Sequence, residues 1–178
     1  SYLIRKIERN APSSVSISQP TVKPNMPQNS FENLQILPIN HPALIKYLGE
    51  RYIDIEIAKT VCKELHFDTK GKHYFGIGFP NIAGGYEIRN PFFKGCIAPK
   101  DISHFYAEEP KNVCFVFEGF MDFLSFMTLR RKENDGLRRQ DYLVLNSVSN
   151  IQKALERLSQ YDSILCFLDN DEAGRNAY

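Results

Sequence analysis

The sequence predicts an α/β fold: a parallel sheet with flanking helices in the C-terminal part, preceded by a small α+β subdomain. From residue 113 onwards, apolar strand-like runs alternate with helical patterns, and such alternation is typical of a helix-covered parallel sheet. Before it, short aromatic and β-branched runs between Lys72 and Phe105 are broken by Gly and Pro, which indicates an antiparallel meander. A chain of 178 residues can bury both units.

The C-terminal part is expected to hold three strands, and each is a short run of apolar residues. The expected order is strand Val113–Phe117, helix Phe120–Arg131, strand Tyr142–Leu145, helix Ile151–Gln160, strand Ser163–Leu168 and the start of a further helix. The chain stops at Tyr178, inside that last helix. We therefore expect a domain truncated at its C-terminus, and the activity of such a fragment on its own is open.

Two helices are expected ahead of the meander. The first follows His41, and the second starts at Asp54, whose side chain can cap it. Residues 11–30 are rich in Pro, Ser, Asn and Gln, which predicts a linker. The sequence thus divides into three parts: an N-terminal tail and linker (1–40), an α+β subdomain (41–110) and an α/β domain (111–178).

Carboxylates follow two of the predicted strands. Glu118 and Asp122 belong to the string Glu-Gly-Phe-Met-Asp, and Asp169 and Asp171 to the string Asp-Asn-Asp-Glu-Ala-Gly-Arg. Ligands of open α/β sheets bind beyond the carboxyl ends of the strands, so we expect Glu118, Asp169 and Asp171 to gather there. Their mutual repulsion and their hard oxygen atoms favour bound Mg²⁺ or Mn²⁺. Asp171 alone could equally cap a helix, but both motifs together, with Gly119 allowing close approach, favour a metal site.

These two motifs resemble those of the Toprim domain, which bacterial DNA primases share with topoisomerases and with some nucleases and recombination proteins. Glu118 matches the acidic first motif, and Asp169 with Asp171 matches the Asp-x-Asp motif. The longer strings are most similar to the primase branch, in particular to Toprim proteins of bacterial mobile elements. Upstream, residues 47–53 resemble the Tyr-Leu-x-x-Arg-Gly element of primase cores, and residues 77–90 resemble their Gly-Phe and Gly-Gly-Arg segment.

Three positions depart from the primase pattern. Tyr52 stands where replicative primases usually have Gly, and Tyr86 stands where they usually have Arg. The loop at residues 145–150 lacks the glycine that the family often shows. These departures concern the backbone geometry and the template contacts.

The resemblance implies a metal-dependent nucleotidyltransferase that makes short RNA primers on single-stranded DNA, in DNA replication or mobile-element transfer. Glu118 would bind metal or abstract a proton, and Asp169 and Asp171 would hold Mg²⁺. Asp122 would orient these ligands without contacting the metal itself, or cap the helix. The implied partners are single-stranded DNA, nucleoside triphosphates, a helicase or mobilisation protein, and an upstream zinc-binding domain. Two alternatives remain: a Toprim nuclease with the same carboxylates, and a nucleic-acid-binding module without catalysis.

Basic and aromatic residues are interleaved between Lys63 and Lys100. Such a mixture can hold phosphates and stack bases, although a half-buried sheet with solvated lysines has the same composition. The primase resemblance favours template contact and selects Lys72, Arg89 and Lys94 as phosphate ligands. The charged run at residues 130–139 is interpreted as solvated surface, with nucleic-acid contact as the alternative.

The remaining residue types indicate little chemistry. The four cysteines include no Cys-x-x-Cys pair, so neither a zinc knuckle nor a disulfide framework is indicated. The four histidines are scattered, no pair has metal-ligand spacing, and we assign them no chemistry. The sequence has no signal peptide and no apolar stretch of membrane-spanning length. We expect a cytoplasmic protein without a membrane partner, and the missing initiator Met indicates a fragment of a longer chain.

Overall fold

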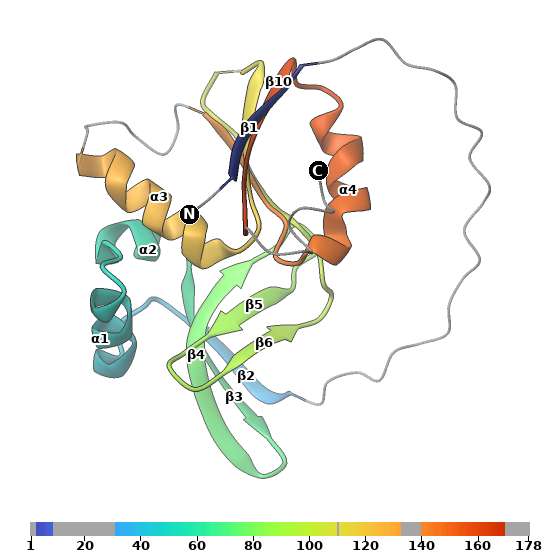
Figure 1. Ribbon diagram of the computed structural model, residues 1–178. Coiled ribbons are helices and arrows are strands. Elements are labelled where there is room, and N and C mark those ends of the chain that lie inside the picture. The colour runs from blue at the N-terminus through green and yellow to red at the C-terminus, as the bar shows by residue number, and fades with distance from the viewer. Residues whose placement is uncertain (1–2, 9–30, 110, 133–139, 170–178) are drawn as a thin grey trace, which may run out of the picture.

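The computed structural model describes residues 3–8, 31–109, 111–132 and 140–169. Within these ranges the chain forms two five-stranded sheets, one parallel at its centre and one antiparallel throughout (Figure 1). The described helices are all too short or too polar to cross a membrane.

The C-terminal sheet has the strand order β1-β10-β8-β9-β7. Its three central strands are parallel: β8 (Val113–Phe117), β9 (Asp141–Val144) and β10 (Ser163–Leu168). Helix α3 (Phe120–Lys132) packs against one face of this sheet and α4 (Ile151–Leu158) against the other, because their buried side chains belong to two separate apolar clusters. The predicted α/β fold with a helix-flanked parallel sheet is therefore confirmed, and α4 ends two residues earlier than expected.

The N-terminal subdomain is an antiparallel sheet with the strand order β2-β3-β4-β5-β6 and two helices at one side. Its elements in chain order are β2 (Glu32–Leu37), α1 (Pro42–Glu50), α2 (Ile55–Val61), β3 (Lys63–Thr69), β4 (Lys72–Pro80), β5 (Tyr86–Arg89) and β6 (Lys94–Ile97). The predicted cap is present, since Asp54 Oδ1 accepts hydrogen bonds from two backbone N–H groups in the first turn of α2.

Three strands lie or pair outside the parts into which the sequence pattern places them. The predicted tail and linker (1–40) contain β1 (Leu3–Glu8) and β2, and β7 (Ser103–Phe105) leaves the predicted meander to pair with β9. Each of these strands covers an edge whose N–H and C=O groups would otherwise lack partners. Such pairing joins segments far apart in the sequence, which local composition does not reveal. Residues 9–30 and the helix expected after Leu168 lie outside the described residues.

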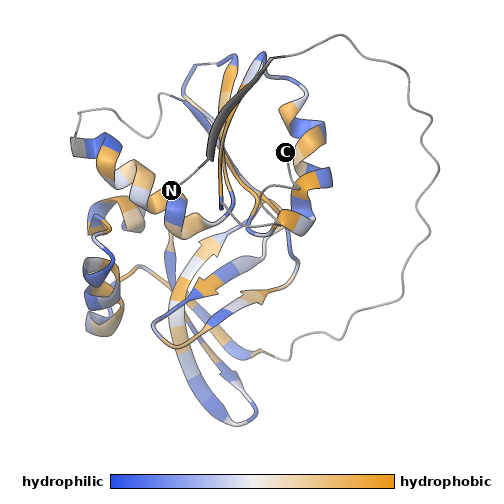
Figure 2. Ribbon diagram, in the orientation of Figure 1, coloured by the Kyte–Doolittle hydropathy of each residue, from blue (hydrophilic) through white to orange (hydrophobic). Residues whose placement is uncertain are grey.

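One apolar cluster joins the two halves. It contains side chains of α1, α2 and β4 together with side chains of α3, β8 and β9. At its centre the ring of Phe79 stacks on Phe120, with centroids 5.0 Å apart, and lies 5.9 Å from Phe123. Figure 2 shows the central strands of the C-terminal sheet as mainly hydrophobic, whereas the outer end of the β3–β4 hairpin is mainly hydrophilic. The shared core fixes how the N-terminal sheet is placed against the C-terminal domain.

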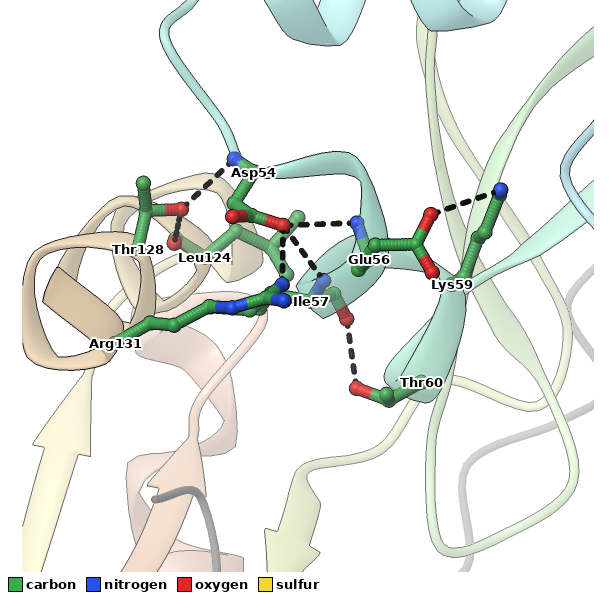
Figure 3. A network of polar contacts seen from close by, with 8 residues as sticks. All are labelled: Asp54, Glu56, Ile57, Lys59, Thr60, Leu124, Thr128 and Arg131. Atoms are coloured by element: carbon green, nitrogen blue, oxygen red, sulfur yellow. Dashed lines mark hydrogen bonds and ion pairs between the residues drawn. The ribbon is translucent and has the colours of Figure 1, made fainter. Parts of the chain in front are cut away.

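A polar contact adds to this core where α2 meets α3 (Figure 3). Besides capping α2, Asp54 Oδ1 accepts a hydrogen bond from Arg131 Nη1 at 2.7 Å. The backbone N–H of Asp54 donates to Thr128 Oγ1 at 3.0 Å, and that hydroxyl donates to the carbonyl of Leu124 at 2.8 Å. We call Asp54, Thr128 and Arg131 the α2–α3 joint. Arg131 of α3 thus contacts the capping residue of α2, and residues 133–139 of the same charged run lie outside the described residues.

Two positions in the primase-like segments have a left-handed backbone. Tyr52, which stands where the primases that this segment resembles usually have Gly, has φ 57° and is 90% exposed. Gly84 has φ 84°, a conformation that glycine adopts without strain. At Tyr52 the same conformation costs free energy, because its Cβ crowds the backbone. The structure therefore explains why a glycine suits the position of Tyr52.

Candidate metal and nucleic-acid cleft

The ends of two neighbouring parallel strands bring the acidic motifs together. Glu118 directly follows β8, and Asp169 directly follows β10. The backbone N–H of Glu118 donates to the carbonyl of Phe167 at 3.3 Å, and Glu118 Oε2 accepts a hydrogen bond from the backbone N–H of Asp169 at 3.1 Å. The two motifs, about fifty residues apart in sequence, are thus in direct contact.

Gly119 places a further carboxylate beside Glu118. It immediately precedes α3, and the N–H of Phe123 donates to its carbonyl at 3.2 Å. A Cβ atom at Gly119 would lie 3.2 Å from Asp122 Oδ2, which is tighter than ordinary contact. The absence of a side chain at Gly119 therefore lets Asp122 turn back towards the strand end.

These acids form one wall of a cleft of about 370 Å³ between the two sheets. The opposite wall carries basic side chains of the N-terminal sheet and of the segment after it: Arg89, Lys94 and Lys100. Phe120 and the loop after β9 complete the lining. The cleft therefore presents carboxylates on one side and cations on the other.

The loop after β9 takes its shape from Asn146. This residue has φ 62°, a region that Asn tolerates better than most residues other than Gly. Its Nδ2 donates to the carbonyl of Asp101 at 2.9 Å and to Ser103 Oγ at 3.0 Å. Within the described part of the chain, its buried Oδ1 has no hydrogen-bond partner. Asn146 thus provides a left-handed turn without a glycine.

A buried carboxyl and a thiol lie behind the basic wall. Glu87 and Cys96 are opposite each other in the β5–β6 pair, and both line the cleft. Burial raises the pKa of Glu87, while the nearby cations counteract part of this rise. Burial and the neighbouring Glu87 carboxylate raise the pKa of Cys96 to about 12. The Cys96 thiol is therefore protonated at neutral pH.

The structure brings five of the predicted site residues to this cleft: Glu118, Asp122, Asp169, Arg89 and Lys94. Lys72 lies elsewhere, at the start of β4 next to the hairpin turn. Asp171 lies outside the described residues.

The cleft also contains Lys100 and Asn146, which sequence reasoning did not assign to the site. Lys100 was only one of many basic residues in its segment, and nothing in the local pattern distinguishes it. Asn146 could have been found, because it follows a predicted strand at the edge where ligands bind.

The side chains on the acidic wall fit a magnesium or manganese ion by their chemistry. Carboxylate oxygens are the ligands that these ions prefer, and Glu118, Asp122 and Asp169 supply only such oxygens. Among the described residues, no group of three or more His, Cys, Asp or Glu side chains is arranged to hold a metal ion. The described acids would therefore provide part of a metal site.

Comparison with known protein families agrees with this division into two sheets. Residues 33–98 match the family described as a domain of unknown function (DUF8464), and residues 115–178 match the Toprim-like family. No curated protein matches the chain. The first match spans β2 to β6, and the second begins inside β8 and includes both acidic motifs. The C-terminal part of this chain, with its helix-flanked parallel sheet and its carboxylates at the strand ends, has the Toprim fold, and we call it the Toprim domain.

Proposed function

We propose that this protein is a metal-dependent nucleotidyltransferase of the DNA primase type, which joins ribonucleotides on a single-stranded DNA template. The observation that carries the proposal is the cleft with one acidic and one basic wall. Phosphoryl transfer between nucleotides needs both, because the reacting phosphates are negatively charged and the attacking hydroxyl must lose a proton.

The acidic wall would serve the reacting atoms. Bound Mg²⁺ or Mn²⁺ would stabilise the negative charge that develops on the phosphoryl oxygens. Glu118 and Asp169 would hold that ion, and Glu118 could alternatively accept the proton of the attacking 3′ hydroxyl. The hydrogen bond from the Asp169 N–H to Glu118 Oε2 leaves the carboxylate fixed at the strand end. Asp171 would complete the set, as the Toprim resemblance implies.

The basic wall would hold phosphates of the template or of the incoming nucleoside triphosphate. Arg89 and Lys94 are directly opposite each other in the β5–β6 pair, so their cationic groups emerge side by side. A guanidinium can bind two phosphate oxygens at once, while an ammonium acts as a point charge. Because the N-terminal sheet supplies this wall, the subdomain and the Toprim domain would bind the substrate together.

The test is incorporation of labelled ribonucleotides on single-stranded DNA with Mg²⁺ or Mn²⁺, followed on a gel that also displays the template. Full-length protein is compared with the Glu118→Gln variant, which keeps the size of the side chain but removes its charge. New product that requires Glu118 supports a primase. A shortened template that requires Glu118 would instead identify a Toprim nuclease, and DNA binding without either product would identify a module without catalysis.

A further inference from the structure

A hydrogen-bonded row of four side chains crosses the β3–β4 hairpin. Glu64 Oε1 lies 2.7 Å from His66 Nε2, and His73 Nδ1 lies 2.8 Å from Asp68 Oδ1. Between these two contacts, His66 Nδ1 and His73 Nε2 face each other at 3.1 Å. The imidazole rings stack with centroids 5.3 Å apart. We call His66 and His73 the histidine pair.

The carboxylates at both ends are held in place. Glu64 Oε2 accepts hydrogen bonds from the backbone N–H groups of Asn40 at 2.9 Å and His41 at 2.7 Å. Asp68 Oδ2 accepts one from Asn33 Nδ2 at 2.8 Å. All these acceptors are carboxylate oxygens, and carboxylates are ionised at neutral pH. We call the ring nitrogens that face the carboxylates, His66 Nε2 and His73 Nδ1, the outer nitrogens, and the two that face each other the inner nitrogens. Each carboxylate therefore fixes one ring of the histidine pair with its outer nitrogen protonated.

Counting protons shows what the inner nitrogens require. When the outer nitrogens of His66 and His73 carry hydrogen, two neutral rings have no proton left for their inner nitrogens. Two lone pairs would then face each other at 3.1 Å, which is unfavourable. The arrangement needs a cation between the rings, either an additional proton or a metal ion.

The geometry also fits a metal ion. Two imidazole nitrogens bound to a tetrahedral ion at 2.0–2.1 Å are separated by about 3.3 Å, close to the spacing in the histidine pair. Histidine ligands of metals also typically donate their other ring N–H to a carboxylate, which fixes the tautomer. His66 and His73 each have such a carboxylate. His73 is 58% exposed and His66 is 18% exposed, so water can reach the inner nitrogens and fill further coordination positions.

We propose that His66 Nδ1 and His73 Nε2 bind a divalent transition-metal ion such as Zn²⁺, with Glu64 and Asp68 orienting the two rings. This site differs from the cleft in its ligands, which are imidazole nitrogens, and imidazole suits Zn²⁺, Cu²⁺ and Ni²⁺ better than Mg²⁺. It lies on β3 and β4, whereas the basic wall of the cleft lies on β5, β6 and the segment that follows. A bound ion would link the two strands of the hairpin across their ladder.

The test is a calorimetric titration of metal-free protein with ZnCl₂ at pH 7.5. The protein carries Glu118→Gln, Asp122→Asn and Asp169→Asn, so that the carboxylates of the acidic wall do not contribute. We expect one saturable site, whose affinity falls at least tenfold in His73→Gln, a change of an exposed side chain. Asp68→Asn should weaken binding ten- to a hundredfold, as loss of an orienting carboxylate typically does.

The matched control is His41→Asn. This histidine lies near the pair, with its ring centroid 6.3 Å from that of His66, but its Nδ1 caps α1 by accepting from the N–H of Ala43. Asparagine can keep that cap, and zinc affinity should stay within twofold. Unchanged affinity in His73→Gln, or no saturable binding in the parent protein, would overturn the proposal. Imidazole ¹⁵N spectra that titrate with pH but do not respond to zinc would assign the pair to a shared proton instead.

Discussion

The α2–α3 joint and the cleft are two places where the N-terminal subdomain meets the Toprim domain. They differ in how their charged side chains are arranged. In the joint, Asp54 and Arg131 form an ion pair at 2.7 Å. In the cleft, carboxylates and cations stand on separate walls around a space of about 370 Å³. The first arrangement connects two helices, and the second lines a space that can hold a ligand.

The joint gains most of its strength from hydrogen bonds. Asp54 and Arg131 have side chains 32% and 51% exposed, and ion pairs of this kind contribute little because water screens them. The cap on α2 and the Thr128 hydroxyl satisfy backbone N–H groups that have no partner within the helix. Polar groups at the joint therefore act on stability, whereas polar groups in the cleft are expected to act on binding and turnover.

The largest expected effect is on catalysis. Glu118→Gln should lower metal-dependent activity by at least about a hundredfold, a loss typical of removing a positioned catalytic group. Its free energy of unfolding should change by less than about 1 kcal/mol, because the amide oxygen can still accept the hydrogen bond from Asp169 N–H. Activity assays and urea denaturation of the same preparation check both parts. A large loss of stability would mean that Glu118 has a structural role, like the residues of the joint.

The opposite pattern is expected at the joint. Asp54→Ala removes the cap of α2 and the contact with Arg131, and should lower the free energy of unfolding by about 2 kcal/mol. Asp54→Asn is the matched control, because an amide oxygen still caps the helix and only the charge is lost. The unfolding midpoint in urea measures both variants. Equal destabilisation by Ala and Asn would show that the ion pair dominates the joint.

On the basic wall, Arg89→Ala should weaken binding of single-stranded DNA by about tenfold and reduce the slope of log affinity against log salt by about one. Fluorescence anisotropy at several salt concentrations measures both quantities. Lys72→Ala is the control, because it removes the same charge at a position outside the cleft, where β4 begins beside the hairpin turn. Similar losses in both variants would mean that nucleic acid contacts the N-terminal sheet beyond the cleft.

The smallest effect is expected away from both regions. Tyr52→Gly should raise the free energy of unfolding by about 1 kcal/mol, because it relieves a left-handed backbone at a residue with a Cβ. Tyr52→Ala removes the ring but keeps the Cβ, and should not stabilise. If Tyr52→Gly instead destabilised the protein, the exposed ring would have a role that its surroundings do not reveal.

Much of the C-terminal domain could be predicted because its signals are local. Short apolar runs indicated the three parallel strands, and the carboxylates that follow them indicated a site at one edge of the sheet. Departures from the primase pattern at Tyr52 and in the loop of Asn146 also marked positions where the backbone is left-handed. Patterns of this kind are visible because a strand end or a turn constrains the residues next to it.

Local patterns did not indicate the contacts between distant segments. β1 and β2 lie within the predicted tail and linker (1–40), and β7 pairs outside the predicted meander, because each strand is stabilised by the edge it covers. Arg131 was interpreted as part of a solvated run, although its partner Asp54 lies 77 residues earlier. Neither partner can be recognised from its own neighbourhood.

The sequence by itself determined the helix-flanked parallel sheet, the two acidic motifs and their place at the strand ends, because periodicity and position relative to a strand are local properties. Only the tertiary structure decided that Arg89, Lys94 and Lys100 face those acids, and that His66 and His73 meet across a hairpin between two carboxylates. The reason is physical: strand register and the shared core set which side chains share a space, and both arise from packing of the whole chain.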